Sequence, residues 1–496
     1  MTSIVSTMAL TGINATRVDV QVQLTQGSFA MYMAGLPDNA VKESRERVRG
    51  AFHALGIRLP GKRIAVNLTP ADIAKEGAHY DLPIAVALLM AMGIVPADAT
   101  EQTLCMGELS LNGQINPVNG CLPAAIAGAS EDLIKAIIPA ANAPEAAWSG
   151  ATSVFGAAHL QDVVNHLRGD TPIPPTQPQA RPTADIQNQL DIADIKGQET
   201  AKRAAEIAAA GGHNLLLNGP PGSGKSMLAQ RLPGLLPPLT SAEALEVSMI
   251  HSVAGDVPEG GLVTQRPFRA PHHSASAVAL SGGGLKAHPG EMSLAHHGIL
   301  FLDELPEFPR GVLETLRQPL ETGNITISRA NRHVTYPARF QLIAAMNPCP
   351  CGYLGDPAKQ CRRAPGCADT YQNRLSGPLL DRIDLHVNVP PVRIQDLDLP
   401  RGKESSADMA QRVQAARTRQ NQRGNLNANL QGKVLEEACQ PAPEARQMLQ
   451  TAADKMGLSA RAYHRVLKVA RTIADLQDEA IVSKPHVAEA LAFRGR

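Results

Sequence analysis

The fold of this chain is decided by the run Gly219-Pro220-Pro221-Gly222-Ser223-Gly224-Lys225-Ser226. The run fits the pattern G-x-x-x-x-G-K-[ST] without a mismatch. An apolar segment, 215–217, leads into it, and a segment compatible with a helix, 227–232, leaves it. In a strand–loop–helix context the glycines let backbone N–H groups converge on phosphate oxygens, and the helix points its positive end at the same anion. The run predicts that the chain binds a nucleoside triphosphate, with Lys225 reaching the β- and γ-phosphates and the Ser226 hydroxyl holding Mg²⁺.

Length and composition narrow the class of protein. The 496 residues are enough for about three domains. Charge is nearly balanced, with 47 basic and 46 acidic residues, so no global field draws the chain to nucleic acid or to a membrane. Binding to DNA must come from local basic surface. Aromatic residues make up 3%, which argues against base-stacking platforms as the dominant feature.

The sequence also bears on the compartment. No apolar run approaches the length needed to cross a bilayer, and residues 1–20 lack the pattern of a signal peptide. Seven cysteines in a chain of this size do not indicate a disulfide framework. We therefore expect a cytoplasmic protein with reduced thiols and no membrane partner.

Four regions follow one another along the chain. Residues 1–168 mix alternating and helical segments, which indicates an α/β domain. Residues 169–190 form a proline-rich linker, because closely spaced prolines can continue neither a helix nor a central strand. Residues 191–400 carry the nucleotide-binding run, and residues 401–496 have a helical pattern.

Two further segments extend the nucleotide site. A buried-strand run, 298–302, ends in Asp303 and Glu304. Asp303 is suited to hold Mg²⁺, and Glu304 to orient and deprotonate an attacking water. A second buried strand, 340–346, ends in Asn347, whose amide is placed to contact the γ-phosphate or that water. Together these residues predict hydrolysis as well as binding.

The order of these motifs resembles an AAA+ ATPase, and their details resemble the magnesium-chelatase-related clade. Residues 266–273 with Gly282-Gly283-Gly284 sit where that clade carries a helix-2 insert, and residues 323–339 resemble its pre-sensor-1 β-hairpin. Residues 375–385 resemble the segment with the arginine finger, and 457–462 resemble the sensor-2 helix of a C-terminal lid. With the N-terminal block included, the chain resembles the ComM/YifB family over nearly its whole length. That family consists of magnesium-chelatase-like proteins associated with DNA branch migration in natural transformation.

The resemblance implies an α/β fold: an AAA+ P-loop core with a parallel sheet, an N-terminal Lon-protease-like domain and a C-terminal helical lid. It assigns Arg382 as an arginine finger that enters a neighbouring subunit's ATP site, and Arg461 as sensor 2. A finger supplied to a neighbour implies a homo-oligomer, in this family a hexameric ring. The alternative for Arg382 is local pairing with Asp381 or Asp384, and Arg465 and Arg471 are alternatives to Arg461.

Two stretches without any acidic residue, 260–290 and 322–355, are candidates for contact with DNA phosphates. In the family both elements project toward the central pore of the ring. We expect Arg329 and Arg332, at the tip of the hairpin, to contact the DNA backbone. The alternative is an ordinary solvated hairpin.

Four of the seven cysteines, Cys349, Cys351, Cys361 and Cys367, fall within one loop rich in glycine and proline. Such a loop has few apolar anchors, and a tetrahedral thiolate site would order it. The spacing C-x-C-x9-C-x5-C departs from paired C-x2-C motifs, so free or redox-labile thiols are the alternative. We expect a structural Zn²⁺ rather than a catalytic one, because four thiolates leave no open position.

The N-terminal block resembles a Lon-protease domain that has lost its catalytic dyad. Active Lon domains use a serine activated by a lysine. Here the serine-equivalent position is Asp81 and the lysine-equivalent position is near Leu122. We expect this domain to be non-proteolytic, with Ser110 and Lys135 as an alternative pair.

These observations predict an ATP-hydrolysing ring that acts on branched or forked DNA as a helicase or branch-migration motor, with ATP, Mg²⁺ and Zn²⁺ as ligands. The alternative is a chelatase-like or protein-remodelling AAA+ ATPase that does not act on DNA.

Overall fold

The structure is a computed structural model of the whole chain. It describes all residues except 1, 151, 180–189, 259, 285–286, 330–331, 355–360, 362–365, 393, 398–399 and 495–496. The chain forms two compact units. The first, here the N-terminal unit, comprises 1–182, 240–264 and 287–289, and the second, the ATPase unit, comprises 183–239, 265–286 and 290–496.

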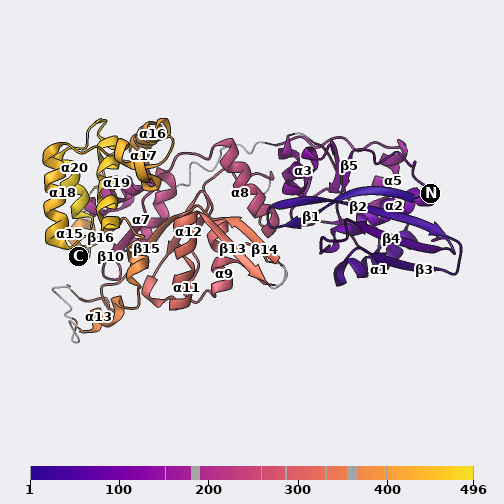
Figure 1. Cartoon of the computed structure of the whole chain (residues 1–496), viewed down its shortest axis with the longest axis horizontal. Coiled ribbons are helices and arrows are strands. Elements are labelled where there is room, and N and C mark those ends of the chain that lie inside the picture. Colours follow the sequence, from indigo (N-terminus) through magenta and orange to yellow (C-terminus); the bar gives the residue numbers. More distant parts are fainter. Residues whose placement is uncertain are drawn as a thin grey trace. The chain divides into compact units, whose positions relative to one another are not determined.

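The N-terminal unit is built on a seven-stranded mixed sheet (Figure 1). The order is β3-β4-β2-β1-β5-β8-β9. Its strands are β1 (Thr2–Thr11), β2 (Asn14–Thr25), β3 (Ala30–Ala34), β4 (Arg63–Thr69), β5 (Thr103–Cys105), β8 (Lys135–Pro139) and β9 (Ser153–Ala157). In β4, Ile64, Val66 and Leu68 are buried while the residues between them are largely exposed. This alternation places one face of the sheet on the core.

Helices pack on both faces of this sheet at its β5-β8-β9 end, where Ile137 joins one hydrophobic cluster and its neighbours Ala136 and Ile138 join another. Helix α2 (Asp81–Ala91) is apolar on every side after its first residue and is buried except at its last residue, as expected of a central helix. The other helices are α1 (Asn39–Ala54), α3 (Cys121–Ser130), α4 (Ala143–Ala146) and α5 (Leu160–Arg168), and a short hairpin joins β6 (Glu108–Leu109) to β7 (Ile115–Asn116).

Residues that follow the nucleotide-binding loop in sequence belong to the N-terminal unit. Helix α8 (Ser241–Ala254) begins with a capping box between Thr240 and Glu243 and packs against α3. The Gly120 N–H donates to the Ser252 carbonyl at 3.0 Å, and Trp148 Nε1 donates to the Gly260 carbonyl at 2.9 Å. Residues 240–264 are therefore an insertion that shares a core with the N-terminal block.

The ATPase unit has a five-stranded parallel sheet in the order β11-β12-β15-β10-β16. Its strands are β10 (Leu215–Asn218), β11 (Phe268–Arg269), β12 (Ile299–Leu302), β15 (Gln341–Met346) and β16 (Leu385–Asn388). The three inner strands are continuous apolar runs, as expected where helices cover both faces. The α/β class and the parallel sheet predicted from sequence are confirmed. The prediction of an insert over residues 266–273 is wrong in part, because Phe268 and Arg269 form the outer strand.

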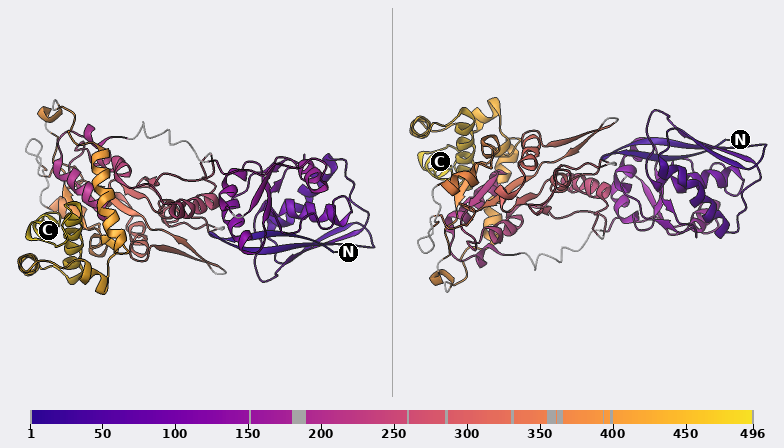
Figure 2. Two further views of the ribbon diagram at one scale, coloured as in Figure 1. Left: turned by 90° about the horizontal axis from the view of Figure 1, so that it is seen from above. Right: turned by 90° about the horizontal axis from the view of Figure 1, so that it is seen from below.

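The predicted β-hairpin is present and projects from the body of the ATPase unit (Figures 1 and 2). Strands β13 (Asn324–Arg329) and β14 (Arg332–Pro337) pair antiparallel. Its base is anchored by buried Ile325, Val334 and Tyr336. The short helices on this side of the chain are α7 (Lys225–Arg231), α9 (Ala277–Ser281), α10 (Glu291–Leu294), α11 (Arg310–Thr315), α12 (Arg317–Thr322), α13 (Gly366–Gln372), α14 (Gly377–Leu380) and α15 (Ile394–Leu397).

A helical region closes the chain and packs on the sheet domain. It contains α16 (Ser406–Gln422), α17 (Gly432–Ala438), α18 (Pro443–Met456), α19 (Ala460–Leu476) and α20 (Lys484–Ala492). Helix α6 (Glu199–Gly211) contacts both α16 and α19, and its buried face is mostly alanine, which permits close helix approach. One hydrophobic core therefore spans sheet and lid.

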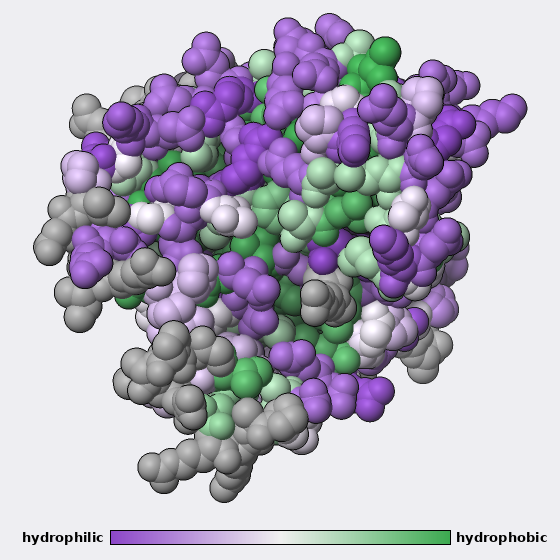
Figure 3. Space-filling model, turned by 90° about the vertical axis from the view of Figure 1, so that its left-hand side faces the viewer, coloured by the Kyte–Doolittle hydropathy of each residue, from purple (hydrophilic) through white to green (hydrophobic). Residues whose placement is uncertain are grey.

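The face of the molecule seen from the side of these C-terminal helices is mainly hydrophilic, with hydrophobic residues showing in the recesses between polar ones (Figure 3). Among the residues described, no helix combines the length and the apolar character that crossing a membrane requires.

Candidate active site

The nucleotide-binding loop lies between β10 and α7 at the carboxyl edge of the parallel sheet, where open α/β sheets bind ligands. Gly222 and Gly224 have φ values of 76° and 91°, a left-handed conformation that side chains disfavour. A Cβ atom at Gly219 would collide with the backbone carbonyl of Val389. The loop therefore needs glycine at these three positions for geometric reasons.

Lys225 lies in the first turn of α7 and turns back over the loop. Its Nζ donates to the carbonyls of Gly219 and Pro220 at 2.7 and 2.9 Å, and to Asn347 Oδ1 at 3.2 Å. Burial lowers the pKa of Lys225, and the nearby carboxylates of Asp303 and Glu304 oppose that shift. The predicted lysine and the predicted asparagine thus meet, although 122 residues separate them.

The hydroxyl and the carboxylate predicted to hold Mg²⁺ also meet. Ser226 Oγ donates to Asp303 Oδ2 at 2.7 Å, while Asp303 Oδ1 accepts from the Glu304 N–H at 2.9 Å. Asp303 is in place because β12 ends at Leu302 beside β15. Oxygen ligands of this kind are the ones that Mg²⁺ prefers.

Glu304 follows Asp303 directly, and half of its side chain is exposed. Its backbone is left-handed, with φ 52°, a costly conformation for a residue other than glycine. His273 Nδ1 lies 3.2 Å from Glu304 Oε2, and the His273 ring packs on His272 with a centroid distance of 4.0 Å. The sequence alone does not predict this contact between His273 and Glu304. One indication in the sequence is that His272 and His273 closely follow β11, the strand beside β12.

The two arginines implied by the family resemblance meet at a single carboxylate. Arg382, whose side chain is 6% exposed, binds Glu321 and donates to the Pro378 carbonyl at 2.6 Å. Arg461, at 55% exposure, donates to the same Glu321 oxygen at 3.0 Å. The alternative prediction, that Arg382 pairs with Asp381 or Asp384, is wrong, because its partner is Glu321.

The remaining arginines of this helical segment have other partners. Arg465 binds Asp384 at 3.2 Å, and buried Arg471 binds Asp475 at 3.0 Å and the carbonyl of Ala480 at 2.6 Å. A pocket of about 590 Å³ opens beside Glu321, and its charged and ionisable lining residues are Glu321, Arg382, Arg461, His464, Arg465 and Lys468. Cations outnumber acids there, so the pocket suits an anion.

The positions predicted to contact DNA are only partly described. The backbones of Arg329 and Arg332 pair at the end of the hairpin, but their side chains lie outside the described residues. Arg269 is neutralised by Glu291 at 2.6 Å, and Arg266 donates to the Pro237 and His297 carbonyls. Of the two stretches without acidic residues, the one that contains the hairpin β13–β14 projects from the body of the ATPase unit.

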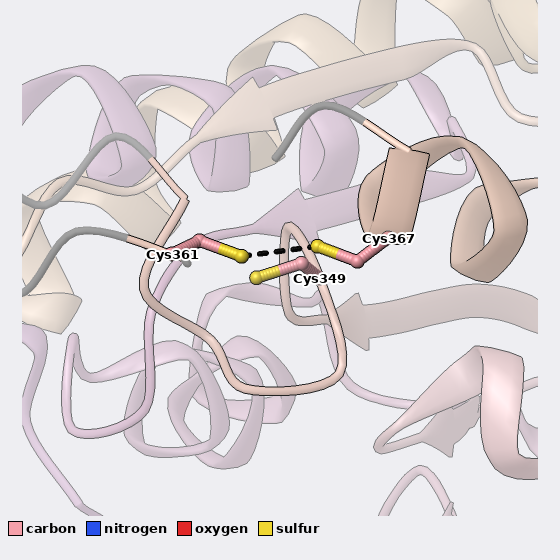
Figure 4. A group of neighbouring side chains, drawn as sticks. All are labelled: Cys349, Cys361 and Cys367. Carbon is pink, nitrogen blue, oxygen red and sulfur yellow. Dashed lines mark hydrogen bonds between the residues drawn. The ribbon is translucent and has the colours of Figure 1, made fainter. Parts of the chain in front are cut away.

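The four cysteines gather after β15, with Cys349, Cys351 and Cys361 before helix α13 and Cys367 in its first turn. Sγ atoms of Cys349 and Cys351 are 3.2 Å apart, and those of Cys361 and Cys367 are 3.0 Å apart. Cys349, Cys361 and Cys367 all have their sulfur atoms within 4.8 Å of one another and point inward (Figure 4). A Cβ atom at Gly352 would collide with Pro221, so the cysteine loop begins against the nucleotide loop.

Comparisons with known proteins agree with this arrangement. The family model described as magnesium chelatase, subunit ChlI, matches residues 191–397; a model of subunit ChlI of Mg-chelatase matches 20–142, and one of its C-terminal part matches 403–494. Competence protein ComM of Haemophilus influenzae is 46% identical over 99% of this chain and 97% of its own length. The chain belongs to the ComM/YifB family of magnesium-chelatase-like AAA+ proteins.

Other relatives range from a similarly close one to a more distant one. Protein YifB of Escherichia coli is 45% identical over 99% of this chain and 97% of its own length. The magnesium-chelatase 38 kDa subunit of Cereibacter sphaeroides is 27% identical over 31% of this chain and 51% of its own length. Membership of this AAA+ family implies ATP and Mg²⁺ as ligands, and related proteins commonly form oligomers.

Proposed function

We propose that this ComM/YifB-family chain is an ATP-driven ring motor that translocates on DNA and moves branched or forked junctions. The observation that carries the ATPase part is the convergence of five groups at one sheet edge: Lys225, Ser226, Asp303, Glu304 and Asn347. A lysine near the phosphates, hard oxygen ligands for Mg²⁺ and an exposed carboxylate are the parts that phosphoryl transfer to water needs.

Each of these residues has a distinct role in the proposal. Lys225 donates to the β- and γ-phosphates, and Ser226 with Asp303 holds the metal. Glu304, which is exposed, accepts the proton of the attacking water. Asn347 already accepts from Lys225, so it is placed to orient the lysine and the γ-phosphate together.

The ring part of the proposal rests on Arg382 and Arg461. Both reach Glu321 within their own chain and line a pocket rich in cations. In the assembled ring they turn to the ATP of the neighbouring subunit, where a guanidinium stabilises the charge that develops on the γ-phosphoryl group. We take the ring to be hexameric, as the family resemblance implies.

The DNA part is supported by the projecting hairpin β13–β14, which carries Arg329 and Arg332 and no acid over its length. It is also supported by the name of the Haemophilus relative, a competence protein, which points to transformation or recombination as the setting. The second candidate, a chelatase-like or protein-remodelling motor, is favoured by the matching magnesium-chelatase models and by the smaller similarity to the 38 kDa subunit.

We further propose that Cys349, Cys351, Cys361 and Cys367 hold a structural Zn²⁺. Their sulfur atoms already converge, and thiolate is a preferred ligand of zinc. The ion would tie the cysteine loop together where it begins against Pro221. Its part in the proposal is to order that loop, and it takes no part in hydrolysis.

The deciding experiment measures ATP hydrolysis and strand separation with single-stranded, duplex, forked and four-way DNA at low salt, on protein shown to be assembled. We expect forked or four-way DNA to stimulate hydrolysis. We also expect the strands of the junction to separate only when ATP is present. The variant Glu304→Gln is the matched control, because it changes one atom of the site and removes the base. If no DNA stimulates hydrolysis while the basal rate is intact, the second candidate replaces the first.

A further inference from the structure

The edge of the N-terminal sheet exposes two aromatic rings. Tyr32 lies on edge strand β3, and Phe29 immediately precedes that strand. They are 54% and 47% exposed, whereas Met31 between them is buried. Large exposed rings that lie close together are uncommon on a surface without a partner. Only 3% of the residues of this chain are aromatic, so two exposed rings close together indicate a binding surface.

Two adjoining hollows of about 740 and 360 Å³ run past these rings. Phe29, Glu46, Arg49 and Leu59 line both hollows, so the hollows form one continuous depression, here called the Phe29 groove. Tyr32 lines one end and exposed Leu111 the other. Helix α1 supplies one wall, through Arg45, Arg49 and His53.

The lining of the groove is basic, although the charge of the whole chain is nearly balanced. The side chains of Arg45 and Arg49 are more than half exposed, and Glu46 lies within 3.1 and 3.8 Å of them. One carboxylate therefore faces two arginines, and Arg58 adds a third to the lining.

A guanidinium already stacks on one of the rings. Arg63 Cζ lies 4.6 Å from the centroid of the Tyr32 ring, within the range of a cation–π contact. The ring and the guanidinium together present a flat surface with positive charge beside it. A purely apolar partner is disfavoured, because it would have to desolvate these arginines. Duplex DNA is disfavoured too, because its base faces are stacked inside the helix and cannot reach the rings.

We propose that the Phe29 groove binds single-stranded DNA, with bases stacked on Phe29 and Tyr32 and phosphates held by Arg45, Arg49 and Arg58. Aromatic platforms alternating with cations are the combination that single strands select, because every base has a stacking face. The proposal rests on the proposed function in one respect: a motor that separates strands produces a single strand. It assigns the N-terminal unit the task of holding that strand.

The test uses the full-length protein and a fluorescein-labelled dT20 oligonucleotide, with affinity measured by fluorescence anisotropy without nucleotide. The double variant Phe29→Ala/Tyr32→Ala should lose affinity by about five- to a hundred-fold per ring removed. Phe29→Tyr and Tyr32→Phe keep the rings and should bind as the unchanged protein does. Ile481→Ala removes a comparably exposed side chain from the ATPase unit and is the matched control.

Two further readouts distinguish stacking and phosphate contact from a general loss of structure. Arg49→Gln should reduce the slope of log affinity against log salt by about 0.7, the value for one phosphate of a single strand. A dT20 carrying 5-iodouracil should crosslink on irradiation to a peptide that contains Phe29 or Tyr32. Thermal melting of the variants should match that of the unchanged protein, since both rings are at the surface.

The outcomes separate the groove from the motor. Unchanged dT20 affinity in the double variant, with crosslinks elsewhere, overturns the groove and leaves the motor intact. Loss of affinity together with loss of the oligomer by mass photometry also overturns it, because the groove is then a contact between copies of the chain. If the unchanged protein binds neither single-stranded nor junction DNA, the proposed function fails as well.

Discussion

His273 Nδ1 lies 3.2 Å from Glu304 Oε2, so the carboxylate proposed to activate water is held by a side chain from the neighbouring strand's loop. The Glu304 backbone is fixed on both sides, because its N–H donates to Asp303 Oδ1 at 2.9 Å and its carbonyl accepts from the Glu307 N–H at 2.7 Å. Its side chain contacts His273. The His273 ring is supported in turn by His272 and by an edge contact with Phe308. His273 is therefore a positioning residue for Glu304.

Removing this support should slow hydrolysis without weakening nucleotide binding. For His273→Ala we expect kcat to fall about ten-fold, which corresponds to about 1.4 kcal/mol for the lost polar contact with Glu304. KM for ATP should not change, because His273 contacts Glu304, whose proposed role is in hydrolysis and not in nucleotide binding. His273→Gln, which can still donate to the carboxylate, should recover part of the rate. A raised KM with unchanged kcat would contradict the positioning role.

Removing the base itself should separate binding from turnover. Glu304→Gln keeps the size and polarity of the side chain but cannot accept a proton, so we expect kcat to fall by about 10²- to 10⁴-fold. Affinity for a fluorescent ATP analogue should stay within about two-fold, well under the 1.4 kcal/mol that a ten-fold change represents. Lys225→Ala is the contrasting control, because it should lose affinity. Turnover retained by Glu304→Gln would assign the base to another residue.

The chain itself shows why some of this site could be predicted and some could not. Asp303 and Asn347 each follow a buried strand, and parallel strands bring their carboxyl ends to one edge. Local pattern was therefore sufficient for these residues. Nothing local indicates that Glu321 joins Arg382 to Arg461, because that contact needs residues 140 positions apart to meet.

The insertion in the N-terminal unit escaped prediction for the same reason. The capping box at Thr240 and the glycine at 255 mark helix α8 correctly at both ends. Its location depends on long-range contacts, such as the one from the Gly120 N–H to the Ser252 carbonyl. Sequence position after the nucleotide loop suggested the ATPase unit, but the apolar face of the helix packs against α3.

The arginine finger should act across a subunit boundary. For Arg382→Ala we expect kcat to fall about 10³-fold, the scale measured for arginine fingers, while ATP affinity is retained. Mixing it with Lys225→Ala, whose finger is intact, should restore part of the hydrolysis, since mixed rings then contain complete sites. Neither variant alone should exceed this residual rate under the same assembly conditions. If no mixing ratio restores activity, Arg382 acts within its own chain or serves only to bind Glu321.

The cysteine loop should carry metal. Protein purified without chelator should contain about one Zn²⁺ per chain, and Cys361→Ser should lose it and lower the melting temperature. Cys105→Ala is the control, because Cys105 is a buried cysteine outside the loop, where burial raises its pKa to about 12. Less than about half an equivalent of zinc in the unchanged protein would leave the four cysteines as free thiols.

Asp81 should prove to be a structural anchor of the N-terminal unit. It is fully buried, and Arg47 donates to it from Nε and Nη2 at 2.5 and 3.0 Å, while the Leu109 N–H donates at 3.0 Å. Asp81→Ala leaves Arg47 without this partner, and we expect a loss of about 3–5 kcal/mol in the free energy of unfolding, measured by urea denaturation. Asp81→Asn keeps the acceptor for Leu109 and should lose less.

The same residue tests the loss of proteolysis. Unfolded casein with ATP should remain uncut by the unchanged protein and by Asp81→Ser, since the resemblance puts Leu122, a buried aliphatic residue, in place of the activating lysine. Ser110, the alternative nucleophile, donates to Asn116 Oδ1 at 3.1 Å, a contact that offers no base. Cleavage abolished by Ser110→Ala would show that the domain is a protease after all, with Asp81 serving only its structure.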